Sequence, residues 1–155
     1  MEIVSALGLD IGKKRIGVAG CDGTGLIAAG ITTIERTSFQ QDVEQLQSLV
    51  TLRSVQVLVV GLPYTMDGNL GFQAKQVQKF VHRLSKILSL PVEYVDERLT
   101  SVEAENQLKA QKRFSTWNKG LIDQQAAQII LQQWLDQRRL GRLGDWETGR
   151  LGKFI

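Results

Sequence analysis

Apolar residues in the first part of the chain follow the spacing of short strands. Three runs rich in aliphatic residues, at 3–10, 15–21 and 26–34, each predict a strand. The stretches between them, 12–14 and 22–25, contain glycine and are typical of hairpin turns. Three strands joined by such short turns predict an antiparallel meander.

The apolar spacing then changes to that of helices. One helix face is marked by residues separated by four, three and four positions: Phe39, Val43, Leu46 and Val50. A near-continuous aliphatic run at 55–61 predicts a strand that is buried on both faces. Asn69 is a candidate cap for a second helix, whose apolar face comprises Val77, Val81, Leu84 and Leu88.

The last part of the chain predicts one more strand and two helices. Pro91 ends the second helix, and residues 92–96 predict the fifth strand. Thr100 and Glu103 fit a capping box, so we expect a short helix to begin there. A polar, basic loop at 111–120 precedes a final helix at 122–139.

The predicted order of elements is β-β-β-α-β-α-β-α-α. A meander that leads into parallel crossovers predicts an α/β fold in which helices flank one mixed five-stranded sheet. This order is typical of the RNase H-like fold. We expect a single domain of this fold at 1–140 and a glycine-rich, loosely ordered C-terminal tail at 141–155.

The composition of the chain limits the chemistry available to it. With one cysteine and one histidine, cysteine-rich or histidine-rich zinc sites are excluded. We expect Cys21 to be buried in a strand and His82 to face solvent on a helix. Any metal ion must then sit on carboxylates, which indicates Mg²⁺ or Mn²⁺. No apolar run reaches the ~18 residues of a membrane span, and the N-terminus lacks signal-peptide features, so we expect a cytoplasmic protein with no membrane partner.

Basic residues gather in clusters although the net charge is only +3. One cluster is Lys13, Lys14 and Arg15. A second stretch, 108–122, holds basic residues and no acid, among them Lys112, Arg113 and Lys119. Basic surface of this kind suits a polyanionic partner such as nucleic acid. For each cluster alone, an ordinary solvated surface is an equal alternative.

Asp10 lies at the end of the first predicted strand, on the same face as Ala6 and Gly8. An acid at the end of an apolar strand is costly unless it is hydrated, paired or bound to a cation. Asp also favours turns, and residues 11 and 12 begin one. The strand alone does not decide between a metal ligand and a turn former.

Two further positions place acids at the ends of elements. Asp96 and Glu97 end the fifth strand and point to opposite faces, so only one of them can reach a shared site; a strand-end ion pair with Arg98 is the alternative. Asp123 lies on the first turn of the last helix, where the helix dipole also favours an acid. If these acids converge around one or two divalent cations, they suit phosphoryl transfer.

The predicted loop at 111–120 combines charge with aromatic residues. Lys112, Arg113 and Lys119 are candidates for phosphate contacts, and Phe114 and Trp117 are candidates for stacking on bases. The alternative is a solvated loop whose aromatic residues fold into the core.

Several motifs together resemble the YqgF family, which is described as Holliday-junction resolvases and pre-ribosomal-RNA nucleases. The resemblance covers about residues 5–137 and rests on four segments in order: ALGLDIGKKRIGVA (6–19), VVGLPYTMDG (59–68), VDERLTSVEAE (95–105) and IDQQAAQIILQ (122–132). It implies an RNase H-like fold.

The resemblance also implies roles for individual residues. Asp10, Glu97 and Asp123 correspond to the acids that act in catalysis and bind the metal. Residues implied to line the site or meet the phosphate are Lys13, Arg15, Arg98, Thr100 and Ser101. The fourth strand ends in Val60-Gly61-Leu62-Pro63, where many relatives of the wider fold carry an acid, and this leaves the number of metal ions open.

These features favour a metal-dependent endonuclease that acts on structured nucleic acid. Its substrate is either ribosomal RNA precursor, at the 5′ end of the small-subunit RNA, or a branched DNA junction. The alternatives are a non-catalytic ribosome-assembly factor that binds nucleic acid, and a phosphotransferase, for which the chain is short and no Walker A motif is present. Both a monomer and a homodimer fit the sequence.

Overall fold

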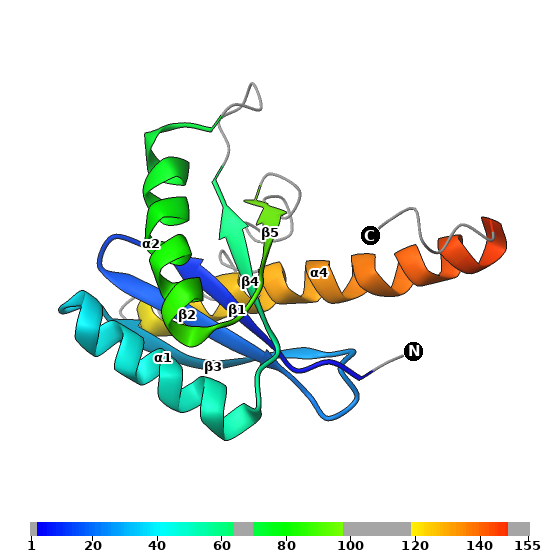
Figure 1. Cartoon of the computed structure of the whole chain (residues 1–155), viewed down its shortest axis with the longest axis horizontal. Coiled ribbons are helices and arrows are strands. Elements are labelled where there is room, and N and C mark those ends of the chain that lie inside the picture. Colours follow the sequence, from blue (N-terminus) through cyan, green and yellow to red (C-terminus); the bar gives the residue numbers. More distant parts are fainter. Residues whose placement is uncertain (1–2, 64–69, 98–118, 149–155) are drawn as a thin grey trace.

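The computed structural model describes residues 3–63, 70–97 and 119–148, with the backbone alone at 119 and 141–148. Within these residues, five strands form one sheet in the order β3-β2-β1-β4-β5 (Figure 1). Their bounds are β1 Ala6–Ile11, β2 Arg15–Cys21, β3 Ala28–Glu35, β4 Val57–Leu62 and β5 Val92–Asp96. β1, β2 and β3 are antiparallel neighbours, whereas β4 runs parallel to both β1 and β5. The predicted mixed sheet is therefore confirmed.

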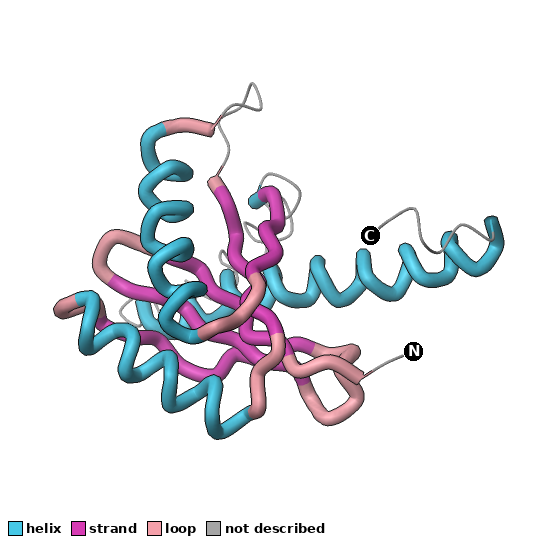
Figure 2. The backbone as a smooth tube through the Cα atoms, viewed as in Figure 1, coloured by secondary structure: helices cyan, strands magenta, loops and turns pink. Residues whose placement is uncertain are grey.

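Helices cover both faces of the sheet. α1 (Phe39–Arg53) and α2 (Phe72–Leu88) pack on one face, and α4 (Lys119–Thr148) crosses the other and projects beyond it (Figure 1). The tube in Figure 2 shows the same layers, with short turns between the first three strands. The parallel β1, β4 and β5 thus have helices on both sides, as parallel strands usually do.

Local capping sets the ends of α1. The Ser38 hydroxyl accepts a hydrogen bond from the backbone N–H of Gln41, which satisfies one of the free donors of the first turn. Ser54, with φ 52° and ψ 49°, ends the helix in the left-handed conformation.

Two helix boundaries differ from the sequence prediction. The N-cap of α2 is Gly71, so the predicted cap Asn69, which lies outside the described residues, is wrong. The first buried residue of this helix is Ala74. A helix that begins at Phe72 therefore already includes its whole buried face, and an earlier start is not needed. The backbone of α4 continues to Thr148 rather than ending near residue 139.

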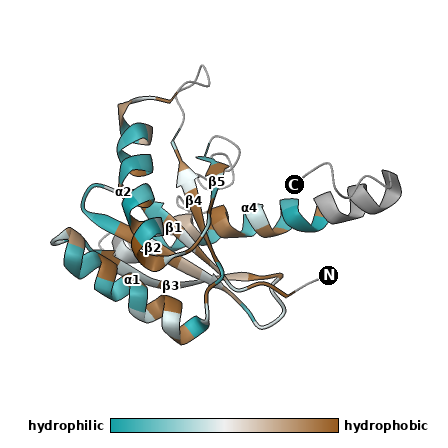
Figure 3. Ribbon diagram, in the orientation of Figure 1, coloured by the Kyte–Doolittle hydropathy of each residue, from teal (hydrophilic) through white to brown (hydrophobic). Residues whose placement is uncertain are grey.

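Two apolar layers hold the sheet. Alternate residues of β1, such as Leu7 and Leu9, pack with α1 and α2, whereas Ala6 packs with α4 residues such as Ala127 and Leu131. Figure 3 shows the corresponding contrast between apolar strands and the hydrophilic outer turns of α1 and α2. The burial of β4 on both faces confirms the prediction from its continuous aliphatic run.

Two single residues lie where the sequence predicts them. Cys21 is buried at the end of β2, with its thiol 3.7 Å from the Ala6 carbonyl oxygen that accepts its hydrogen bond. His82 is exposed on α2. The short helix expected at Thr100 lies outside the described residues, as does most of the basic loop. In the described part of the chain, none of the helices has the length and apolar character that a membrane span requires.

Candidate active site

Asp10 occupies the face of β1 that α4 covers. It pairs across the antiparallel ladder with Gly17 of β2, and it lies one residue before the end of its strand. The neighbouring Leu9 pairs with Val60 of β4, so Gly61 is the next β4 residue toward the same edge. Asp10 therefore lies at the carboxyl end of the central strand, between a glycine of β2 and a glycine of β4.

Glu97 reaches the same face from the end of β5. A methyl group added to Gly61 would lie 2.8 Å from the Glu97 carboxylate oxygen Oε1 and 2.5 Å from Ile130 Cδ1 of α4. The glutamate side chain thus lies directly over Gly61, which has no side chain of its own. This confirms that Glu97, and not its neighbour Asp96, points to the face where Asp10 lies.

Asp123 enters from α4, and a glycine again makes room. The backbone carbonyl of Asp123 occupies the place where a side chain on Gly17 would begin. Because Gly17 pairs with Asp10, the first turns of α4 stack directly on the backbone beside the β1 acid. The hydroxyl of Thr33 on β3 donates to the Gly120 carbonyl and fixes the same end of the helix.

Arg15 holds the Asp123 carboxylate. Its Nε donates to Asp123 Oδ2 at 2.6 Å, and the two side chains are 25% and 22% exposed. The hydrogen bond raises the pKa of the Arg15 guanidinium further, so this residue stays cationic. The pair joins the start of β2 to α4 at the edge of the site.

The two strand-end acids have strongly raised pKa values. Burial raises the pKa of Asp10 from 3.8 to about 6, and the negative charge of Asp123 adds to the effect. Burial raises the pKa of Glu97 from 4.5 to about 7, with further contributions from the charges of Asp10 and then Asp96. The negative charge of another acid therefore adds to each pKa shift. Nearby positive charge does not offset the rise in pKa that burial causes.

The donor set suits a hard divalent cation. Carboxylate oxygens are the ligands that Mg²⁺ and Mn²⁺ prefer, and a cation would relieve the repulsion that raises the pKa values of Asp10 and Glu97. Within the described residues, no three acidic, histidine or cysteine side chains already stand together as one metal-binding group. Asp123 is bound to Arg15, yet its negative charge still raises the pKa of Asp10, and the charge of Asp10 in turn raises the pKa of Glu97.

The other predicted contact residues are distributed unevenly. Lys13 and Lys14 are exposed on the turn between β1 and β2, and Lys119 begins α4 without a described side chain. The remaining predicted residues lie outside the described part of the chain: Arg98, Thr100, Ser101, Lys112, Arg113 and Trp117.

Sequence reasoning missed the glycines that make the site possible. Gly17 and Gly61 read as ordinary strand residues, yet each leaves the space in which an acid from another element lies. Gly8 does the same for Leu131, whose Cβ would lie 2.7 Å from a methyl group there. The available signal was that these three glycines lie within strands, as do Gly20 and Gly30, although glycine is unfavourable there.

The order and the directions of the strands are those of the RNase H-like fold. Among solved structures, RuvC of Thermus thermophilus in complex with a Holliday junction substrate is similar, with a TM-score of 0.57 at 12% identity over 89% of this chain and 97% of RuvC. At this identity the likeness establishes the fold, which is that of RuvC-like resolvases.

Sequence comparisons then identify the family. The family model RuvX, described as Holliday junction resolvase, matches residues 4–137. A Rippkaea orientalis protein is 80% identical over 139 residues, which are 90% of this chain and 100% of that protein. A Synechocystis protein is 72% identical over 136 residues, 88% and 90% of the two chains; both carry the description "Putative pre-16S rRNA nuclease". The chain belongs to the RuvX family of nucleases, which confirms the resemblance found in its motifs.

Proposed function

We propose that this protein is a divalent-metal-dependent endonuclease that processes ribosomal RNA precursor, with Asp10, Glu97 and Asp123 as its catalytic acids. The observation that carries the proposal is the pair of acids on one face at the carboxyl ends of β1 and β5, whose pKa values are raised to about 6 and about 7. Buried acids with strongly raised pKa values are typical of functional sites.

Asp10 and Glu97 are the proposed metal ligands, with Asp123 beside them. When bound, Mg²⁺ or Mn²⁺ would supply an activated water and stabilise the leaving oxygen of the phosphodiester. α4 excludes solvent from one side of Asp10 because it packs directly on Gly17. Arg15 fixes the carboxylate of Asp123 and brings a positive charge to the edge where a phosphate would approach.

The substrate is proposed from the relatives. Their description as putative pre-16S rRNA nucleases favours the small-subunit RNA of a ribosome precursor, and such a substrate also implies a cytoplasmic protein. Resolution of Holliday junctions is the second candidate, favoured by the description of the family model. The basic turn residues Lys13 and Lys14 suit the phosphate backbone of either.

The test is a cleavage assay on both substrates with the full-length chain. A small-subunit RNA precursor and a four-way DNA junction are each incubated with Mg²⁺ or Mn²⁺. We expect cleavage of the RNA, and a loss of at least about 100-fold for Asp10→Asn and for Glu97→Gln. Glu44→Gln, which changes an exposed acid of α1, is the matched control and should keep full activity.

Each other outcome has a defined meaning. Wild-type activity in Asp10→Asn would contradict the assignment of the site. Cleavage of the junction but not of the RNA would favour the second candidate. Binding of nucleic acid with no metal-dependent cleavage would favour the alternative of a non-catalytic assembly factor. Mass in solution, measured beside these assays, decides between a monomer and a homodimer.

A further inference from the structure

A cavity lined by charged and aromatic side chains lies on the face of the sheet opposite α4. Its volume is about 630 Å³, and it is bounded by the turn after β1, the segment that leads into α1, the start of α1 and residues 72–83 of α2. The charged side chains that line it are Lys13, Arg36, Asp42, Lys79 and Arg83. None of the three acids of the candidate active site lines this cavity.

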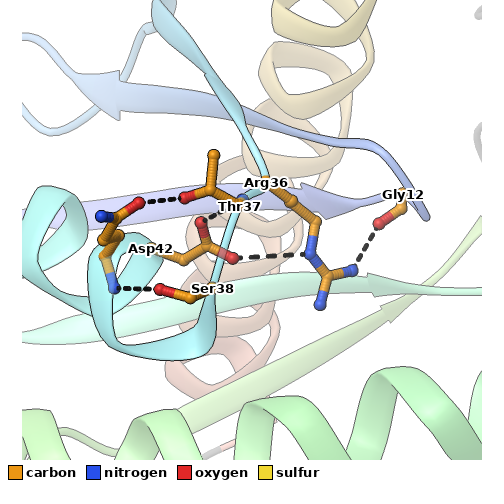
Figure 4. A network of polar contacts seen from close by, with 6 residues as sticks. Gly12, Arg36, Thr37, Ser38 and Asp42 are labelled. Atoms are coloured by element: carbon orange, nitrogen blue, oxygen red, sulfur yellow. Dashed lines mark hydrogen bonds and ion pairs between the residues drawn. The ribbon is translucent and has the colours of Figure 1, made fainter.

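The charge of the cavity is strongly positive. Its acid, Asp42, is only 2% exposed and already engaged: it accepts a hydrogen bond from the Thr37 N–H and lies 3.7 Å from Arg36 Nε (Figure 4). Lys79 and Arg83 are exposed on α2, one turn apart, and no ion pair to either exists within the described residues. The same holds for Lys13, so three cations face the cavity without a compensating acid.

The arginines of the cavity are held in fixed positions. Arg36 Nη1 donates to the Gly12 carbonyl at 2.6 Å (Figure 4). The guanidinium of Arg36 also lies 4.6 Å from the centre of the Phe80 ring. The Arg83 guanidinium lies 3.8 Å from the centre of the Phe39 ring, which itself packs edge-on against Phe80. Guanidinium groups ordered in this way lose little entropy when they bind an anion.

The cavity begins where the candidate active site ends. Ile11, Gly12 and Lys13 line it, and they directly follow Asp10 in the chain. Phe72, which is 78% exposed, lies at the other side of the cavity and offers an aromatic face for a base. A nucleic-acid strand with one phosphate at Asp10 therefore needs to cross only the turn after β1 to reach the basic side chains of the cavity and Phe72.

We propose that this cavity binds the phosphodiester backbone of the nucleic-acid substrate beside the bond that is cleaved. The inference rests on the proposed nuclease function and adds a second contact region on the other face of the sheet. Lys79 and Arg83 bind phosphate oxygens, Arg36 holds the turn that joins the cavity to Asp10, and Phe72 packs against a base. The other source of the same anionic group is a free phosphate or a mononucleotide.

The experiment measures binding separately from cleavage. Full-length Asp10→Asn protein, which retains the cavity, is titrated with the labelled RNA precursor from about 50 to about 200 mM salt and compared with the same protein carrying Lys79→Gln and Arg83→Gln. The matched control carries Lys75→Gln and Lys86→Gln, which remove the same charge from exposed positions of α2 outside the cavity. Lys79→Gln alone serves as a milder variant that breaks no contact with Phe39.

We expect the cavity variant to lose about two phosphate contacts. Each contact contributes about 0.7 to 0.9 to the slope of log affinity against log salt, so the loss of affinity over this salt range should be about 7-fold to 12-fold smaller than in the parent. For Lys79→Gln alone, the decrease in slope should be about half of the decrease for the double variant. The control pair should keep the slope of the parent.

The possible failures are distinguishable. If the parent binds RNA and the cavity variant keeps the parent's slope, the cavity inference is overturned and the nuclease proposal stands. If the parent binds neither RNA nor the DNA junction, both are overturned. Calorimetry with inorganic phosphate and with a mononucleotide completes the test: micromolar binding that Lys79→Gln abolishes, with unchanged RNA binding, would assign the cavity to a small ligand instead.

Discussion

The buried carboxylate of Asp10 should make the metal-free protein less stable at neutral pH than a neutral side chain of the same shape would. Its pKa is about 6 in the folded protein against an ordinary value of 3.8, so the folded state binds this proton more tightly than the unfolded state does. Stability from this group is therefore complete below about pH 4 and is lost as the pH rises through about 6. The shift of about two decades in proton affinity corresponds to about 3 kcal/mol at pH values above both.

Asp10→Asn removes this cost. We expect the variant, in the presence of a chelator, to be more stable than the wild type by up to about 3 kcal/mol near pH 8 and by about half of that near pH 5. For a chain of this length, the larger value corresponds to a rise of about 6 to 12 °C in melting temperature. The same change removes the negative charge that helps to raise the pKa of Glu97, which adds to the gain.

The measurement is urea unfolding of both proteins at several pH values, followed by circular dichroism. Glu44→Gln is the control because this exposed acid should change stability by no more than about 0.5 kcal/mol. An Asp10→Asn protein that is equal to or less stable than the wild type near pH 8 would refute the reasoning. Saturating Mg²⁺ should stabilise the wild type and leave the variant nearly unchanged, since only the wild type keeps the proposed ligand.

Three further substitutions test the structure around the site. Gly17→Ala places a methyl group against the Asp123 carbonyl and should destabilise the fold by about 1 to 3 kcal/mol, as read from urea unfolding; an unchanged stability would contradict the close approach of α4. Arg15→Gln should lower the unfolding free energy by no more than about 1 kcal/mol because its ion pair is partly exposed. It should nevertheless lower the rate of RNA cleavage, and an unchanged rate would exclude Arg15 from the site. Ser38→Ala removes the hydroxyl that accepts from Gln41 and should lower the unfolding free energy by about 1 kcal/mol in the same measurement, and an unchanged value would contradict the role of this cap.

The parts of the fold with a clean local pattern were predictable from the sequence. The strands at 15–21 and 92–96 have the predicted bounds, because short turns or a proline mark where they begin and end. The end of α4 was not predictable in the same way. Gly141 and Gly144 are unfavourable within helices, yet the backbone remains helical through both.

The sequence shows which acids lie at the ends of elements, but it does not show the contacts between them. Asp10 and the pair Asp96 and Glu97 are candidates because they end strands. Alternation allows only one of the pair to reach a shared site, and the family resemblance, not the alternation, implies that it is Glu97. The bond between Arg15 and Asp123 joins residues 108 positions apart, and no local pattern predicts such a pair. The basic cavity likewise depends on how α2 lies against the turn after β1, although Lys79 and Arg83 share one face of their helix.

The close packing of α4 and the raised pKa values of the acids have one cause. A side chain on Gly17 or Gly61 would keep the helix and the glutamate away from the sheet, and water would then reach Asp10 and Glu97. With glycine at both positions, the acids lie in a space where burial is the largest contribution to each pKa shift. Such a space holds a carboxylate at neutral pH only at a cost in stability, and a proton or a cation removes that cost. The fold thus gives up stability at this edge of the sheet, and a bound divalent cation would restore it where the proposed chemistry takes place.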